Sequence, residues 1–173
     1  MATGRDNQLA KQVGEYLVAA EAARLGLIAT TFTGNVPHFD ILACNLKGAH
    51  RTIQVKAIRR SAWQFDVRQF ADVQLEGKSQ IIGRPATPPC PGLICVLVRI
   101  GEKHGTDEFY IMTWEDLRAI IIGHYRDYLA KCGGIRPKKF DSYHVALQPK
   151  EIAPHRDKWE LLVEGLVKVK IGG

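Results

Sequence analysis

An acid and an amine occupy two neighbouring segments that otherwise have the composition of buried strands. Asp40 lies in the run 37–44, and Lys56 lies in the run 51–58. Each charged residue shares its run with apolar neighbours, and an unpaired charge in an apolar setting costs several kcal/mol. The two groups therefore either neutralise each other as an ion pair or serve a reaction in which an ammonium stabilises developing negative charge.

These two runs predict a pair of strands. Side chains alternate between the faces of a strand, so Asp40 shares a face with Leu42, and Lys56 shares a face with Gln54. The polar residues 45–50 can reverse the chain, which makes the two strands antiparallel neighbours. The acid and the amine then project from adjacent strands.

A third candidate, Glu15, comes from a predicted helix over residues 6–25, which Asp6 caps and Gly26 ends. Glu15 lies off the apolar stripe of this helix, yet the residues that follow it on its own face are small and apolar. We therefore expect the helix to be buried on two sides, with Glu15 facing the sheet. The alternative is a surface pair with Lys11, worth only a few tenths of a kcal/mol.

The spacing of these residues resembles the core of the PD-(D/E)XK nuclease superfamily. Asp40 matches the aspartate of its first strand, and Glu15 matches the glutamate that its helix supplies. Gln54-Val55-Lys56 matches the acid-x-lysine of the next strand, with glutamine where the family usually has an acid. The order of one helix and three strands over residues 6–58 fits as well. The resemblance implies an α/β, restriction-endonuclease-like fold, with a mixed central β-sheet flanked by helices.

The resemblance also implies metal-dependent hydrolysis of DNA phosphodiester bonds, as by a magnesium-dependent endodeoxyribonuclease. Mg²⁺, or Mn²⁺, would be bound by Glu15, Asp40, the side-chain oxygen of Gln54 and the backbone carbonyl of Val55. Lys56 would orient the attacking water or stabilise charge on the phosphate. The catalytic residues implied are Asp40, Gln54, Lys56 and Glu15.

Two alternatives stay open. Gln54 leaves one negative charge fewer around a cation, which favours a catalytically silent nuclease-fold protein that binds nucleic acid or a protein partner. The second alternative is a buried ion pair between Lys56 and Asp40, with Gln54 hydrogen-bonding beside it.

Composition sets broader limits. The chain has 173 residues and a net charge of +6, which predicts one domain over 1–173 and favours an anionic partner such as DNA. The four cysteines form no Cys-x-x-Cys pair, so we expect free thiols and a cytoplasmic location. No apolar run is long enough to span a membrane. Cutting both strands of a duplex suits a homodimer.

Walker-type phosphate loops and Gly-x-Ser-x-Gly elbows are absent from the sequence, so nucleotide hydrolysis and esterase chemistry have no support.

The remaining chain predicts further elements. Trp63 and Phe65 are expected in the core, with stacking on bases as the alternative. Arg59, Arg60 and Arg68 are candidates for phosphate contacts or a solvated edge. The other expectations are a leader over 1–5, strands at 27–32, 93–100, 108–113 and 140–147, a helix at 114–131 capped by Thr113, loops at 83–92 and 135–139, a docked segment at 155–162 and a strand or pairing arm at 167–171.

Overall fold

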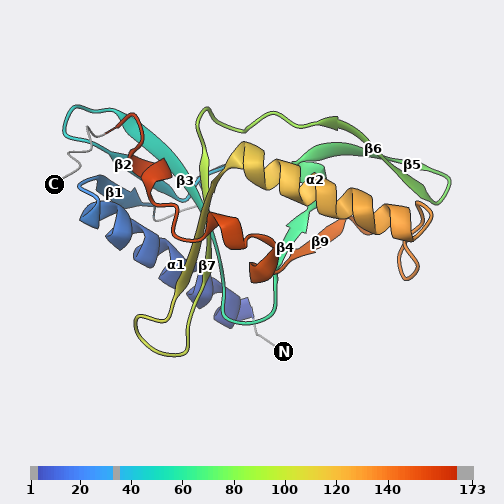
Figure 1. Cartoon of the computed structure of the whole chain (residues 1–173), viewed down its shortest axis with the longest axis horizontal. Coiled ribbons are helices and arrows are strands. Elements are labelled where there is room, and N and C mark those ends of the chain that lie inside the picture. The colour runs from blue at the N-terminus through green and yellow to red at the C-terminus, as the bar shows by residue number, and fades with distance from the viewer. Residues whose placement is uncertain (1–3, 33–35, 167–173) are drawn as a thin grey trace.

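The centre of the computed structural model, which describes residues 4–32 and 36–166, is a five-stranded sheet in the order β1-β2-β3-β7-β8 (Figure 1). β3 and β7 are parallel, and the other neighbours are antiparallel. These strands are β1 (Ile28–Thr31), β2 (Ile41–Cys44), β3 (His50–Ile58), β7 (Ile94–Arg99) and β8 (Glu108–Thr113). The expected mixed sheet with flanking helices is confirmed.

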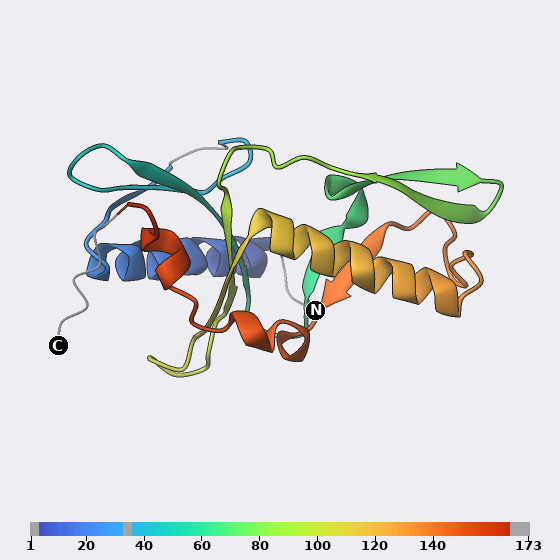
Figure 2. The same ribbon diagram turned by 45° about the horizontal axis from the view of Figure 1, so that its top comes forward.

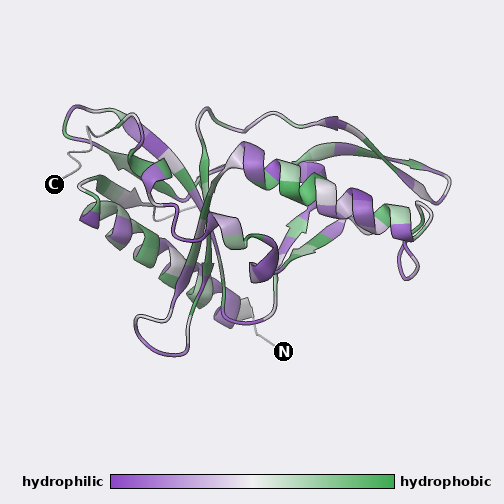
Figure 3. Ribbon diagram, viewed as in Figure 1, coloured by the Kyte–Doolittle hydropathy of each residue, from purple (hydrophilic) through white to green (hydrophobic). Residues whose placement is uncertain are grey.

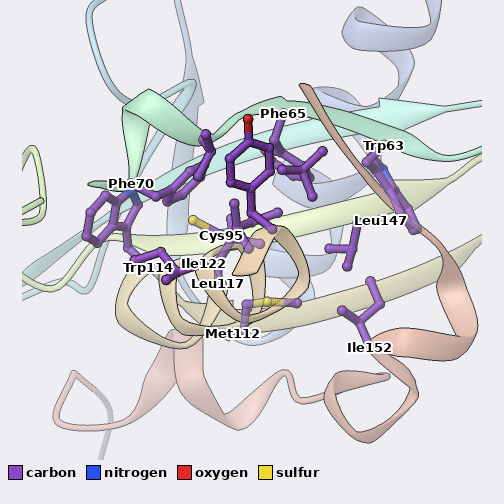
Figure 4. Close-up of a cluster of buried hydrophobic side chains, with 14 of the residues drawn as sticks. Trp63, Phe65, Phe70, Cys95, Met112, Trp114, Leu117, Ile122, Leu147 and Ile152 are labelled. Atoms are coloured by element: carbon purple, nitrogen blue, oxygen red, sulfur yellow. The ribbon is translucent and has the colours of Figure 1, made fainter. Parts of the chain in front are cut away.

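Two helices bury the two faces of this sheet. α1 (Gly4–Arg24) packs on the face that contains Ile53 and Val55, and α2 (Trp114–Lys131) packs on the face that contains Cys95 and Leu97. Figure 3 shows hydrophobic and hydrophilic positions alternating along both helices, as expected when one side of a helix is buried. Figure 4 shows the cluster on the α2 side, where aromatic rings lie around Cys95 and Met112 lies among aliphatic side chains.

The parallel pair requires a crossover, and this connection carries the strands β4 (Trp63–Asp66), β5 (Ala71–Glu76) and β6 (Ser79–Pro85), which form two small sheets together with the later strand β9 (His144–Leu147). β4 pairs with β9, and β5 pairs with β6. Figures 1 and 2 both show the β5–β6 hairpin and the end of α2 extending away from the central sheet. Four short helices complete the fold. Three are 3₁₀-helices, η1 (Val67–Gln69), η2 (Pro149–Glu151) and η3 (Ala153–His155), and the fourth is α3 (Glu160–Val163).

Several local predictions are confirmed. Thr113 caps α2 by accepting a 3.1 Å hydrogen bond from the Asp116 N–H. Gly26 follows α1 with φ 84°, a left-handed conformation that suits glycine at a helix end. Trp159 docks on the core with its ring 5.1 Å from that of Phe109. All four cysteines are free thiols. None of the described helices is both long and apolar enough to cross a membrane.

Other predictions are wrong in their boundaries or partners. Gly4 and Arg5 belong to α1 rather than to a leader. β2 begins only at Ile41, so Asp40 precedes the strand instead of lying in it. Residues 83–85 end β6, because Pro85 is tolerated at the end of a strand, where its missing N–H is not needed. The predicted strand at 140–147 pairs with β4 and not with the central sheet. The predicted strand or pairing arm at 167–171 lies outside the described residues.

Candidate active site

One edge of β3 lacks a strand partner along about half of its length. β2 pairs with β3 only as far as Ile41 opposite Ile53, whereas β3 continues to Ile58. Just before β2, His38 has φ 76°, a left-handed conformation in which the chain cannot continue as an extended strand. β2 therefore cannot extend past this point to cover the rest of β3.

Asp40 occupies this uncovered edge. Its backbone N–H donates to the Ile53 carbonyl at 2.9 Å, and its Oδ2 accepts from the Val55 N–H at 2.8 Å. A side-chain carboxylate thus takes the place of a strand partner. Because the N–H and C=O of one strand residue project to the same side, the Val55 carbonyl faces the same edge.

α1 brings a second carboxylate to Asp40. Lys11 Nζ lies 3.5 Å from Glu15 Oε1 and 3.3 Å from Asp40 Oδ1, so one ammonium bridges the two acids. A glycine makes this approach possible, because a Cβ at Gly14 would lie only 2.5 Å from Ala57 Cβ. Both carboxylates are largely covered, with exposed side-chain fractions of 13% for Glu15 and 17% for Asp40.

The electrostatics of this cluster favour a cation. Burial, followed by the charge of Asp40, raises the pKa of Glu15, and Lys11 offsets this only in part. Burial opposes the charge of Lys11, but Asp40 and Glu15 outweigh it and raise the pKa of its ammonium. The two acids therefore repel each other, and a positive charge between them relieves the repulsion.

Lys56 approaches from the other face of β3. Its Nζ lies 4.7 Å from the centroid of the Phe65 ring, and its backbone carbonyl accepts a 2.9 Å hydrogen bond from Trp63 Nε1. Burial lowers the pKa of Lys56, and the negative charge of Asp40 offsets this only in part. Trp63 and Phe65 are buried, so the prediction of core aromatics is confirmed and stacking of these rings on bases is excluded.

The structure does not form the ion pair between Asp40 and Lys56 that the sequence left open as an alternative. Among the described residues, the ion pair of Asp40 is formed with Lys11, on the α1 side of the sheet. Lys56 responds to the charge of Asp40 without pairing with it directly.

Gln54 is the predicted site residue that the structure holds apart from the carboxylates. Its Oε1 contacts Cys95 Sγ at 4.0 Å, on the face of β3 that packs toward α2. Its two neighbours in the strand both bond to Asp40, so the backbone of Gln54 lies within the site while its side chain points away from α1.

The structure thus bonds Asp40 to Val55 directly, connects Glu15 to Asp40 through Lys11, and adds Lys56 through its electrostatic coupling to Asp40. The residue that sequence reasoning missed is Lys11, which appeared only as a surface partner of Glu15. Its four-residue spacing from Glu15 was a visible signal, but its contact with Asp40 depends on the packing of α1 against β3 and leaves no local pattern.

The donor atoms at this edge fit a hard divalent cation. The Lys11 ammonium already stands as a positive charge between two carboxylates, and the Val55 carbonyl adds a neutral oxygen. Within residues 4–32 and 36–166, no group of three His, Cys, Asp or Glu residues could hold a metal ion. Two carboxylates completed by neutral oxygens and water are typical of Mg²⁺, which keeps several waters in its coordination shell.

Comparisons with known proteins add little to this picture. No family model matches the chain, and no curated protein matches it. The chain is similar to a solved structure of a bacterial homing endonuclease, I-Ssp6803I, at 12% sequence identity and a TM-score of 0.48, over 91% of this chain and 93% of that chain. A likeness this distant assigns neither a family nor an activity.

Proposed function

We propose that this chain is a metal-dependent nuclease of the restriction-endonuclease-like type, which hydrolyses DNA phosphodiester bonds at the open edge of β3. The observation that carries the proposal is the convergence of Glu15 and Asp40, from separate elements, on a single positive charge. Placing two partly buried carboxylates together is costly unless a cation binds between them. The net charge of +6 supports an anionic substrate.

Each residue has a role that follows from its contacts. Glu15, Asp40 and the Val55 carbonyl would hold Mg²⁺ or Mn²⁺, and Gln54 would add a neutral fourth donor only after its side chain turned away from Cys95. The bound ion supplies Lewis acidity and lowers the pKa of a coordinated water. The hydrogen bond from Val55 fixes the orientation of Asp40. Lys56 places its side-chain nitrogen next to this edge, and its lowered pKa leaves a larger fraction of it unprotonated at a given pH than in an ordinary lysine.

A second candidate function is binding of nucleic acid without cleavage. Gln54 favours it, because this residue supplies a neutral amide where an acid would strengthen the hold on the metal. Its side chain also contacts Cys95 rather than either carboxylate. A chain of this kind would keep the basic surface while losing catalysis.

The test is cleavage of plasmid and of synthetic branched DNA with Mg²⁺ or Mn²⁺. Asp40→Asn keeps the size of the side chain and its acceptor for the Val55 N–H, so it removes charge with little loss of stability. Lys56→Met keeps the length of the side chain without its ammonium. Glu76→Gln, on the exposed β5–β6 hairpin, is the matched control for loss of one carboxylate.

We expect cleavage by the wild type and by Glu76→Gln, and its loss in Asp40→Asn and Lys56→Met. Cleavage that survives in both site variants would exclude this edge as the active site. Binding by the wild type without cleavage under either metal would favour the second function.

A further inference from the structure

A basic cavity lies at the end of β3 that carries the candidate active site. It has a volume of about 490 Å³ and is formed by two loops, the one between β3 and β4 and the one between β7 and β8. Figure 1 shows both loops at the lower end of the central sheet. Its lining consists of Arg59, Arg60, Ser61, Arg99, Ile100, Gly101, Glu102, Thr106 and Glu108.

The positive charge of this cavity is not used up by its own acids. The lining carries three arginines against the two acids Glu102 and Glu108. Glu108 pairs with Arg99 of the same lining, whose Nη1 lies 3.4 Å from its Oε2, and with Arg156, whose Nη1 lies 3.5 Å from its Oε1. In contrast, neither Arg59 nor Arg60 forms an ion pair or a side-chain hydrogen bond with any residue that the structure describes. Two exposed guanidinium groups therefore remain available to an anion.

The cavity is held open by well-fixed loops. On one side, Asp107 Oδ1 accepts from the Gly101 N–H at 2.9 Å, and Thr106 Oγ1 donates to the Lys103 carbonyl at 2.7 Å. On the other side, Ser61 has φ 72°, a conformation that non-glycine residues adopt only at a cost and that is concentrated at functional sites. A preformed cavity binds its ligand without first ordering a loop.

Position links this cavity to the active site. Arg59 follows Lys56 by three residues, which is about 10 Å at the rise of an extended strand. Successive phosphates of one DNA strand are about 3.4 Å apart along the helix axis. The cavity therefore lies within a few nucleotides of a phosphate bound at Asp40 and Lys56.

We propose that this cavity binds a backbone phosphate of the DNA strand, a few nucleotides from the scissile bond, through Arg59 and Arg60. The inference rests on the proposed function for the identity of the ligand. Guanidinium groups suit this role because their paired N–H donors match two phosphate oxygens.

The experiment measures binding of a labelled 20-base-pair duplex in EDTA, where metal-dependent cleavage is prevented, across a range of salt concentrations. The test variant is the double change Arg59→Ala and Arg60→Ala. A second variant, Arg59→Lys with Arg60→Lys, keeps the charge but not the paired donors. The control, Arg24→Ala with Lys47→Ala, removes the same charge at the end of α1 and in the β2–β3 turn, at the opposite end of β3.

We expect the alanine pair to weaken binding severalfold and to reduce the slope of log K against log salt by about 0.9, the value for one lost phosphate contact. The lysine pair should keep the slope but bind less tightly. The control should bind as the wild type does. An alanine pair that behaves like the control overturns the proposal, and so does a polyglutamate peptide that competes equally well with DNA for this cavity.

The two proposals fail in different ways. If Asp40-dependent cleavage occurs while the alanine pair binds and cuts normally, the cavity proposal is wrong and the nuclease function stands. If the wild type never cleaves but its binding depends on Arg59 and Arg60, the phosphate site stands and the nuclease function is wrong.

Discussion

Lys11 Nζ lies 3.3 Å from Asp40 Oδ1, although one residue belongs to the first helix and the other to the segment before β2. The same ammonium reaches Glu15 at 3.5 Å. Lys11 therefore lies between the two carboxylates that we propose as metal ligands, and its side chain is about half exposed to solvent. This relationship links the affinity of the metal to a residue that need not coordinate it.

Replacing Lys11 with alanine should tighten Mg²⁺ binding severalfold, because the ion no longer displaces an ammonium from the two carboxylates. Exposed ion pairs contribute at most about 1 kcal/mol each, which limits the gain. Isothermal titration calorimetry of Lys11→Ala against Lys47→Ala, a surface control, measures the difference. Weaker binding in Lys11→Ala would show that the ammonium supports the ion instead of competing with it.

Stability should fall as pH rises above 4.5 through the titration of Glu15. Burial and the charge of Asp40 raise the pKa of this carboxyl in the fold above its ordinary value of 4.5, so between the unfolded and the folded pKa the folded state holds more protons than the unfolded state. The free energy of unfolding then decreases until Glu15 is fully ionised. Urea denaturation between pH 4 and pH 7 should show this slope in the wild type and a shallower one in Glu15→Gln. Adding Mg²⁺ should raise stability most at the upper end, where Glu15 is charged.

Two helical glycines should respond in opposite directions to alanine. Gly14→Ala brings its Cβ to 2.5 Å from Ala57 Cβ, which forces α1 away from β3. We expect a loss of about 1–2 kcal/mol, since overpacking exceeds the helix propensity gained. Gly123→Ala, in α2, meets no atom within 4 Å and should stabilise by about 0.5–1 kcal/mol. Thermal denaturation measures both, and equal shifts would contradict the close contact.

Lys56→Met should stabilise the fold by up to about 1 kcal/mol while abolishing cleavage, as in other cases where function and stability conflict. Burial lowers the pKa of Lys56, so its charged form is less favourable in the folded state than in the unfolded state. The advantage of the variant should shrink as pH rises toward 10.5, where the unfolded lysine also loses its proton. Destabilisation by the methionine at neutral pH would instead point to a stabilising ion pair.

Gln54→Glu should strengthen Mg²⁺ binding severalfold if its side chain is able to turn toward the uncovered edge, because it adds a third negative charge to the ligand set. Calorimetry provides the measurement, and Gln64→Glu, on the exposed face of β4, is the control for an added charge. Unchanged affinity together with lower stability would mean that the side chain stays beside Cys95.

The strongest local signals in the sequence were sufficient for the central elements. Thr113 and the acids after it marked the start of α2, and the apolar run 94–99 marked a strand buried on both faces. The pairing of the two segments around residues 45–50 also followed from alternation and a polar turn. These features depend on short-range patterns, which a single sequence displays directly.

Other features left no such pattern. The β5–β6 hairpin is mostly exposed, so its residues lack the apolar alternation that marks a half-buried strand. Asp40 fitted the alternation of a strand, yet β2 begins only after it, at Ile41, because the positive φ of His38 interrupts the extended backbone just before Asp40. The contact between Lys11 and Asp40 required the position of α1, which Gly14 sets by its close approach to β3.

The early end of β2 has a consequence for how this edge could arise or be lost. If residues 38–40 were extended, a main-chain carbonyl would accept from the Val55 N–H in place of the Asp40 carboxylate. Ordinary strand pairing would then cover the open edge of β3, although Asp40 and Lys56 themselves would be unchanged. A substitution at His38 that favours extended geometry could therefore silence the site while leaving every charged group in the chain intact.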